Sequence, residues 1–158
     1  MTKEMKQIFT RRITQANRTQ LVVVVYDMLL TYLDDAKKAY RVDNMYEFVS
    51  DIEHARNCIA ELRSSLNFEF ELSKTLFSIY SFADRKLASD IYSFDAENLD
   101  AISKLFEKLR DAYHKVSKED TSEPLMANVQ GVYAGLTYGK TDINESFGNY
   151  GNKRGYYI

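Results

Sequence analysis

The sequence predicts an all-α fold: an antiparallel up-down four-helix bundle with a short N-terminal docking helix and an irregular C-terminal tail. All six glycines and the only proline fall after residue 123, so nothing before that point interrupts long helices. Apolar residues recur there at helical spacing, and short connections make successive helices antiparallel neighbours. The chain then divides into an N-terminal docking arm (1–16), a four-helix bundle (17–117) and a Gly/Tyr-rich C-terminal tail (118–158).

The docking arm contains a short amphipathic segment at 4–13, with Met5, Ile8, Phe9 and Ile13 on one side. Residues 1–20 hold five Lys and Arg against one acid, whereas 21–116 hold twelve against seventeen. The basic arm can therefore lie on the acidic body or remain a solvated tail, and the charges alone leave both open.

The first bundle helix is predicted over 18–40. Asn17 can cap its first amides and Gln20 can reach back to the cap residue, which makes a capping box. The four valines 22–25 favour a strand, but the apolar run continues to Leu33 without Gly or Pro, which is too long for one. Two adjacent stripes result, so this helix should be the most buried. The stripes are Leu21, Val25, Met28, Tyr32 and Val22, Tyr26, Leu29, Leu33.

Three further helices are predicted at about 45–66, 71–90 and 95–117, the last with Asp95 as its N-cap. Each carries an apolar stripe. The stripes are Phe48, Ile52, Ala55, Ile59, Leu62, Leu66; then Leu72, Leu76, Ile79, Ala83 with Phe77, Tyr80, Leu87; and Leu99, Ile102, Phe106, Leu109, Tyr113, Val116.

The tail is too glycine-rich for a packed helix and too aromatic for an ordinary linker. We expect one or two helical turns within 125–133. We also expect 125–138 to pack on the bundle surface near the path of a bound partner, in the same chain or a neighbouring one, and 140–158 to bind weakly or stay mobile.

The bulk composition indicates one cytoplasmic domain. The chain has 158 residues, a net charge of −2, no apolar run of membrane-spanning length and no secretory h-region. We therefore expect neither nucleic acid nor membrane insertion. The single cysteine, Cys58, excludes an intramolecular disulfide and favours a reducing compartment.

Four motifs stand in order along residues 8–116. They are Gln15-Ala16-Asn17-Arg18 with Leu21 and Tyr26-Asp27; Ala55, Ile59, Glu61-Leu62 and Ser65-Leu66-Asn67; Tyr80, Phe82 and Arg85-Lys86-Leu87; and Leu99, Ile102 and Arg110-Asp111-Ala112-Tyr113. This ordered set resembles the FliS-type flagellar export chaperones, which hold flagellin in the cytoplasm before secretion. The chain departs from that pattern at Arg18 (Pro in the family), Met28 (Gly), Asp90-Ile91 (Ala-Asn) and Tyr113 (Trp).

The resemblance implies a non-enzymatic chaperone without cofactors that binds the C-terminal amphipathic segments of flagellin stoichiometrically, prevents premature polymerisation and delivers flagellin to the flagellar export apparatus. A segment of this kind would lie with its apolar face in a groove of the bundle, and the docking helix would cover that groove in the free protein. An export-gate contact of the arm and a homodimer stay open. The expected client-binding residues are Ile8, Phe9, Ile13, Val22, Tyr26, Leu29, Leu33, Phe77, Tyr80 and Phe106.

Two alternatives come from other classes of protein. One is a structural or adaptor bundle that binds partners through its tail. The other is a di-metal carboxylate oxidase, built from Asp51-x-x-His54 and Asp111-x-x-His114 with Asp27 or Asp34 and Asp84. The histidines lie off the apolar stripes, so surface histidines are expected, and Cys58 is expected in the core. Twelve Tyr and nine Phe exceed what one small core holds, so some should lie exposed at a partner site.

Overall fold

The computed structural model describes residues 1–126, which contain five α-helices and no strand. The all-α prediction is confirmed, and each helix lies close to its expected position. The helices are α1 (Lys3–Gln15), α2 (Arg18–Arg41), α3 (Met45–Ser64), α4 (Glu71–Ser93) and α5 (Leu99–Glu119). None of these described helices is long and apolar enough to cross a membrane.

Helix α2 lies at the centre, as its two apolar stripes predict. It packs against α1, α3 and α5 and contains more buried residues than any other helix. The capping box is present: the Gln20 amide donates to the Asn17 side chain, and the Asn17 amide donates to the Gln20 side chain. Val24 is buried and Val25 half-buried. The expectation that α2 is the most buried helix is confirmed.

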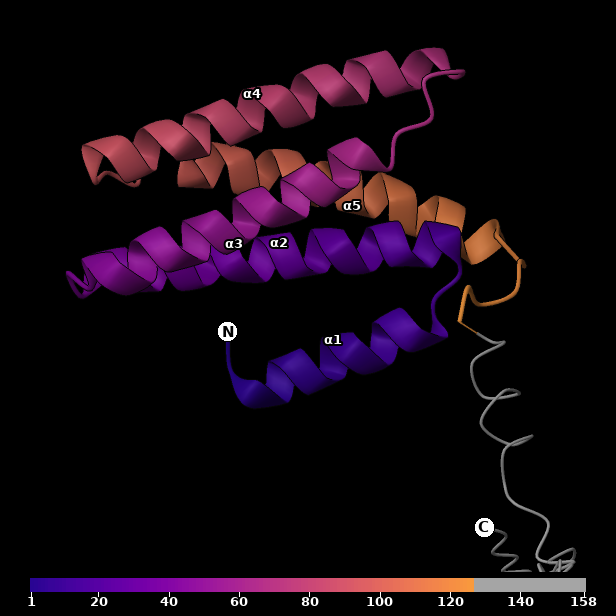
Figure 1. The fold of residues 1–158 in the computed structure, drawn as a ribbon, viewed down its shortest axis with the longest axis horizontal. Helices are drawn as coiled ribbons and strands as arrows, with labels where there is room; N and C mark the ends of the chain where they lie inside the picture. Colours follow the sequence, from indigo (N-terminus) through magenta and orange to yellow (C-terminus); the bar gives the residue numbers. More distant parts are fainter. Residues whose placement is uncertain (127–158) are drawn as a thin grey trace, which may run out of the picture. The chain divides into compact units, whose positions relative to one another are not determined.

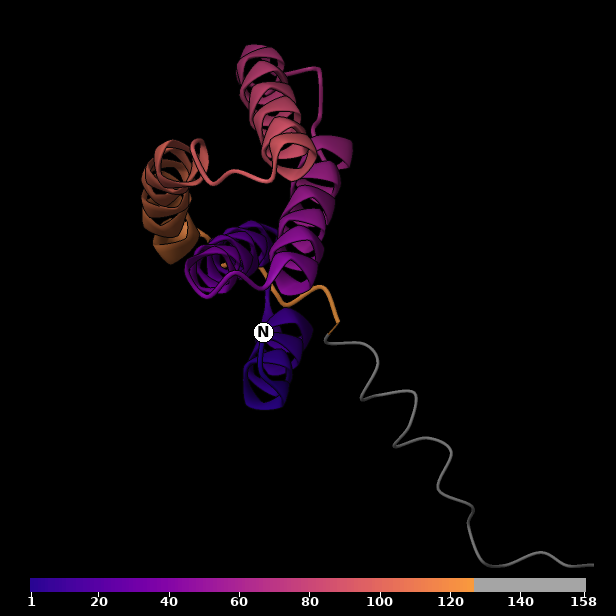
Figure 2. The same cartoon turned by 90° about the vertical axis from the view of Figure 1, so that its left-hand side faces the viewer.

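The bundle is arranged in the order α4, α3, α2, α5 (Figures 1 and 2). The main helix pairs are α2 with α3, α2 with α5 and α3 with α4, and the pair of α4 and α5 is not among them. Aromatic side chains fill the space between α4 and α5. The rings of Tyr80 and Phe106 stack with their centroids 6.1 Å apart, and both lie near Tyr26 of α2. The hydroxyls of Tyr26 and Tyr80 form a hydrogen bond.

The link between α4 and α5 differs from the prediction at Asp95. Helix α4 runs to Ser93 and ends at Phe94 in the left-handed conformation, with φ of 51°. Asp95 does not cap α5, because its carboxylate accepts from the neighbouring Ala96 amide and from the Tyr40 hydroxyl. The N-cap is instead Asn98, whose side-chain amide donates to the buried carboxylate of Asp90.

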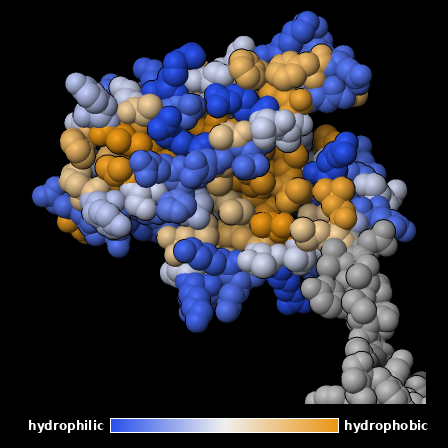
Figure 3. All heavy atoms as spheres, in the orientation of Figure 1, coloured by the Kyte–Doolittle hydropathy of each residue, from blue (hydrophilic) through white to orange (hydrophobic). Residues whose placement is uncertain are grey.

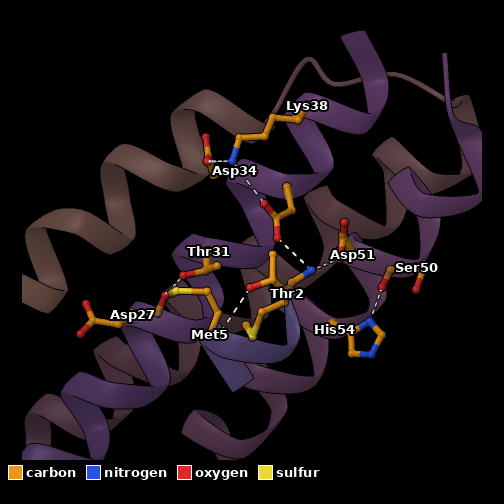
Figure 4. A network of polar contacts seen from close by, with 11 residues as sticks. Thr2, Met5, Asp27, Thr31, Asp34, Lys38, Ser50, Asp51 and His54 are labelled. Atoms are coloured by element: carbon orange, nitrogen blue, oxygen red, sulfur yellow. Dashed lines mark hydrogen bonds and ion pairs between the residues drawn. The ribbon is translucent and has the colours of Figure 1, made fainter. Parts of the chain in front are cut away.

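Helix α1 lies against α2 on the side away from α4 (Figures 1 and 2). Its Phe9 side chain is buried, and Arg12 pairs with Asp27 of α2 at 2.6 Å. At the other end of α1, the Met1 ammonium lies 2.9 Å from Asp35 and 3.9 Å from Asp51 (Figure 4). The basic arm therefore lies on the acidic body, which settles the choice that the sequence leaves open.

After α5 the chain turns back towards the start of α2. The Leu125 amide donates to the carbonyl of Ala16, in the turn between α1 and α2. The described chain ends at 126, so the expected packing of the tail lies outside the described residues beyond that point.

Candidate functional site

An apolar cavity of about 680 Å³ opens at one end of the bundle. Because the four bundle helices are antiparallel, α2 and α4 begin at this end while α3 and α5 finish there. All four helices contribute to the wall. The apolar lining residues are Leu21, Val22, Val25, Leu62, Leu66, Phe70, Leu72, Leu76, Tyr80, Tyr113 and Leu125.

The base of the cavity is formed by buried side chains, and its rim is exposed. Leu62, Leu76 and Tyr80 are buried, whereas Phe70 is 65% and Leu72 63% exposed. Figure 3 shows apolar side chains gathered on the surface towards this end, beneath the projecting start of α4. Large apolar side chains left exposed around a hollow are typical of a surface that binds a partner.

The loop before α4 holds the rim in place. The Ser73 hydroxyl donates to the carbonyl of Asn67 at 2.6 Å, and the Asn67 side chain accepts from the Glu69 amide. The Phe68 ring packs edge-on against Phe77 of α4 at 5.8 Å. These contacts fix the loop that carries Phe70 to the rim.

Few charges face the cavity. Arg18 and Glu61 are the charged residues among its described lining. At the base of the cavity, burial raises the pKa of Tyr80 to about 12. In the core beside it, burial together with Tyr80 raises the pKa of Tyr26 further. Both tyrosines are therefore neutral near pH 7. The described lining of the cavity therefore suits an apolar surface.

The expected client-binding residues fall into three groups. Val22 and Tyr80 line the cavity. Tyr26, Leu29, Leu33 and Phe106 are fully buried in the core beside it. The remainder lie elsewhere: Phe77 is exposed on α4, while on α1 Ile8 is exposed, Ile13 half-buried and Phe9 buried. No residue of α1 lines this cavity, so α1 covers a different part of α2.

Sequence reasoning missed most of the cavity wall. The wall also includes Leu21, Val25, Leu62, Leu66, Phe70, Leu72, Leu76, Tyr113 and Leu125. Most of these residues belong to the recognised apolar stripes, but a stripe does not show which of its residues another helix covers. Their common signal is position, because they lie near the helix ends that an antiparallel bundle brings together.

The acidic residues considered for a metal centre lie in separate ion pairs. Asp27 pairs with Arg12, Asp34 with Lys38 and Asp84 with Arg56. His54 and His114 are exposed, and the His54 ring stacks on Tyr32. Within residues 1–126, no group of three potential ligands could hold a metal ion. The expectation of surface histidines is confirmed.

Cys58 is buried, as expected for a core cysteine. Burial raises the pKa of its thiol to about 11, so the thiol stays protonated near neutral pH.

One ion cluster joins two of the motifs quoted from the sequence. Asp27, which follows Tyr26 in α2, lies 2.6 Å from Arg12 of α1 and 3.8 Å from Arg110 of α5. Arg110 also lies 3.0 Å from the adjacent Asp111. The Tyr-Asp and Arg-Asp motifs therefore meet in space, where they connect α1, α2 and α5.

Comparison with known proteins identifies the family. The profile of the family described as "Flagellar protein FliS" matches residues 1–120. A solved structure described as a flagellar chaperone from bacteria superposes with a TM-score of 0.62 at 16% identity, and the match covers 73% of this chain and 99% of that one. No curated protein matches the sequence. Since the family profile spans most of the chain, this protein belongs to the FliS family of flagellar proteins.

Proposed function

We propose that this protein is a cytoplasmic export chaperone that binds a C-terminal amphipathic segment of flagellin in the cavity at the end of the bundle. The observation that carries the proposal is an apolar cavity with an exposed rim in a member of the FliS family. The solved structure that shares this fold is described as a flagellar chaperone. Binding is stoichiometric, prevents premature polymerisation and delivers flagellin to the export apparatus.

The binding mode follows from the shape and chemistry of the wall. An amphipathic helix has one apolar face, which remains exposed until the helix assembles with a partner. The exposed Phe70 and Leu72 would cover that face, and the half-buried side chains of α2 would pack beneath it. A groove that receives the apolar face of a helix is a common mode of peptide recognition.

Helix α1 supplies a second part of the proposed client path. It has one buried side chain, Phe9, and pairs with the bundle through Arg12. A longer client can displace α1 and occupy the surface of α2 beneath it. Contacts of one kind then replace contacts of a similar kind, which keeps affinity moderate and allows release. The freed arm is also a candidate contact for the export gate.

The test is binding of the full chain to a synthetic peptide with the C-terminal helical sequence of flagellin from the same organism. Leu72→Asp places a charge on the exposed rim, so the Kd should rise about tenfold or more, because burying a leucine favours binding by roughly 1.5–3 kcal/mol. Tyr92→Asp is the control, since Tyr92 is 90% exposed near the other end of α4. It should bind like the unmodified protein.

Both variants should melt like the parent, because neither residue belongs to the core. Absence of binding by the parent chain would overturn the proposal. Equal binding by the parent and Leu72→Asp would show that the client binds another surface, and the cavity would be ruled out as its site.

A further inference from the structure

The segment 120–126, which follows α5, is fastened across the turn between α1 and α2. The Asn17 side-chain amide donates to the carbonyls of Asp120 at 3.2 Å and Ser122 at 3.3 Å. The Thr19 hydroxyl donates to the Asp120 carboxylate, and the Leu125 amide donates to the Ala16 carbonyl at 3.0 Å. We call this segment the strap.

The side chains that anchor the strap belong to the start of α2. Asn17 is 2% exposed, and the same side chain also caps α2. Thr19 lines the cavity while it holds Asp120. The Asp120 carboxylate also accepts from the Ser122 amide, which tightens the turn at the start of the strap. Hydrogen bonds at both ends hold the strap at the cavity mouth.

The strap places Leu125 in the cavity wall. Leu125 is the lining residue that follows α5, and the cavity keeps its volume of about 680 Å³ with Leu125 in place. Its side chain is still 55% exposed, and the adjacent Met126 is 47% exposed. Leu125 therefore extends the wall without filling the hollow, and it keeps apolar surface that a bound segment could cover.

We propose that the strap is a specificity element of the binding site, in which Leu125 forms an added wall that contacts the bound amphipathic helix. The inference rests on the proposed function, since that helix is the proposed client. The strap forms the part of the cavity wall beside the start of α2, so a bound helix that passes Arg18 and Leu21 would also meet Leu125. A client with an apolar residue at that position binds more tightly than one with a charged residue there.

The test uses the full chain and the same flagellin peptide. Leu125→Asp should raise the Kd about tenfold, which corresponds to about 1.4 kcal/mol. Thr19→Val removes the hydroxyl that holds Asp120, so it should also raise the Kd, by a smaller factor than Leu125→Asp. Val42→Asp is the matched control, because Val42 is an exposed aliphatic residue after the opposite end of α2. It should leave the Kd unchanged, and all three variants should keep the parent melting temperature.

The outcomes separate the two proposals. If the parent binds the peptide and Leu125→Asp binds equally well, the strap inference is overturned and the client site stands. If the parent binds no peptide, the proposed function fails. Amide exchange tests the strap without any client: the Leu125 amide should exchange much more slowly than in an unfolded peptide. Exchange at the unfolded rate would overturn the strap.

Discussion

The Asp90 carboxyl group is buried near the end of α4, and only one of its oxygens has a partner. Asn98 donates to Oδ1, while Oδ2 is buried without a hydrogen bond within residues 1–126. Burial raises the pKa of Asp90, the Asn98 hydrogen bond opposes this rise, and the acidic groups of Asp95 and Glu97 add to it. The raised pKa means that the folded protein holds this proton more strongly than the unfolded chain. Stability should therefore fall as pH rises from about 4 through the raised pKa.

Asp90→Asn should raise the melting temperature at pH 7 by a few degrees and change it little near about pH 2, where the Asp90 carboxyl group is protonated in both the folded and the unfolded state. The substitution keeps the oxygen that Asn98 needs. Thermal unfolding across this pH range is the measurement. Asp100→Asn is the control of opposite sign, because the Lys37 hydrogen bond and charge lower the pKa of Asp100. Loss of the Asp100 charge should lower the stability of the protein slightly at pH 7. An equal effect of Asp90→Asn at both pH values would contradict a raised pKa for Asp90.

The paired hydroxyls of Tyr26 and Tyr80 give a second test within the core. Each is the other's hydrogen-bond partner in a buried site between α2 and α4. Tyr26→Phe or Tyr80→Phe alone leaves one buried hydroxyl unpaired and should cost about 1–3 kcal/mol of unfolding free energy. The double variant should be more stable than the sum of the single changes predicts. A double-mutant cycle in urea measures this coupling, and strict additivity would rule it out.

At the scale of the helices, local signals predicted most of the fold. The Asn17 capping box begins α2, and the absence of Gly and Pro before residue 123 leaves four long helices intact. The error at Asp95 has a tertiary cause, because burial of Asp90 draws Asn98 to the start of α5 and leaves Asp95 in the connection. Sequence spacing alone carries no information on which of two nearby polar residues finds a buried partner.

Helix α1 has fewer buried residues than any bundle helix, since Phe9 is the one buried side chain among its residues, so we expect the bundle to hold it least strongly. Ile13→Asp places a charge on its half-buried face and should loosen α1 while the bundle core stays intact. Client affinity should then change more than the melting temperature, because α1 covers part of the proposed client path. Peptide titration and thermal unfolding test this, with the exposed Gln7→Asp as control. A fall of many degrees with unchanged affinity would argue against α1 as a displaceable cover.

At the scale of the whole molecule, the candidate site depends on topology as much as on sequence. The stripe Val22, Tyr26, Leu29, Leu33 forms one continuous face of α2. Val22 nevertheless lines the cavity, whereas the other three residues lie in the core. Periodicity identifies the face of a helix but not where along its length a neighbour leaves that face uncovered. The predicted antiparallel order does bring together the starts of α2 and α4 and the ends of α3 and α5, which form the cavity wall. The sequence predicts packing of 125–138 on the bundle, but only the structure shows where Leu125 lies, because the strap is anchored to Asn17 and Ala16, more than a hundred residues earlier.

The balance of apolar and charged surface at the cavity leads to a final prediction. Its described lining is apolar except for a few polar groups and the charged Arg18 and Glu61, so client binding should be driven by burial of apolar surface. Calorimetry with the flagellin peptide should show one site per chain and a negative heat-capacity change. Affinity should vary less than about threefold between roughly 50 and 500 mM NaCl, because screening acts mainly on exposed charges. Leu72→Asp should reduce the heat-capacity change. A steep loss of affinity with salt, together with a heat-capacity change near zero, would instead indicate binding to the acidic surface around Asp27 and Asp35, which α1 occupies in this structure.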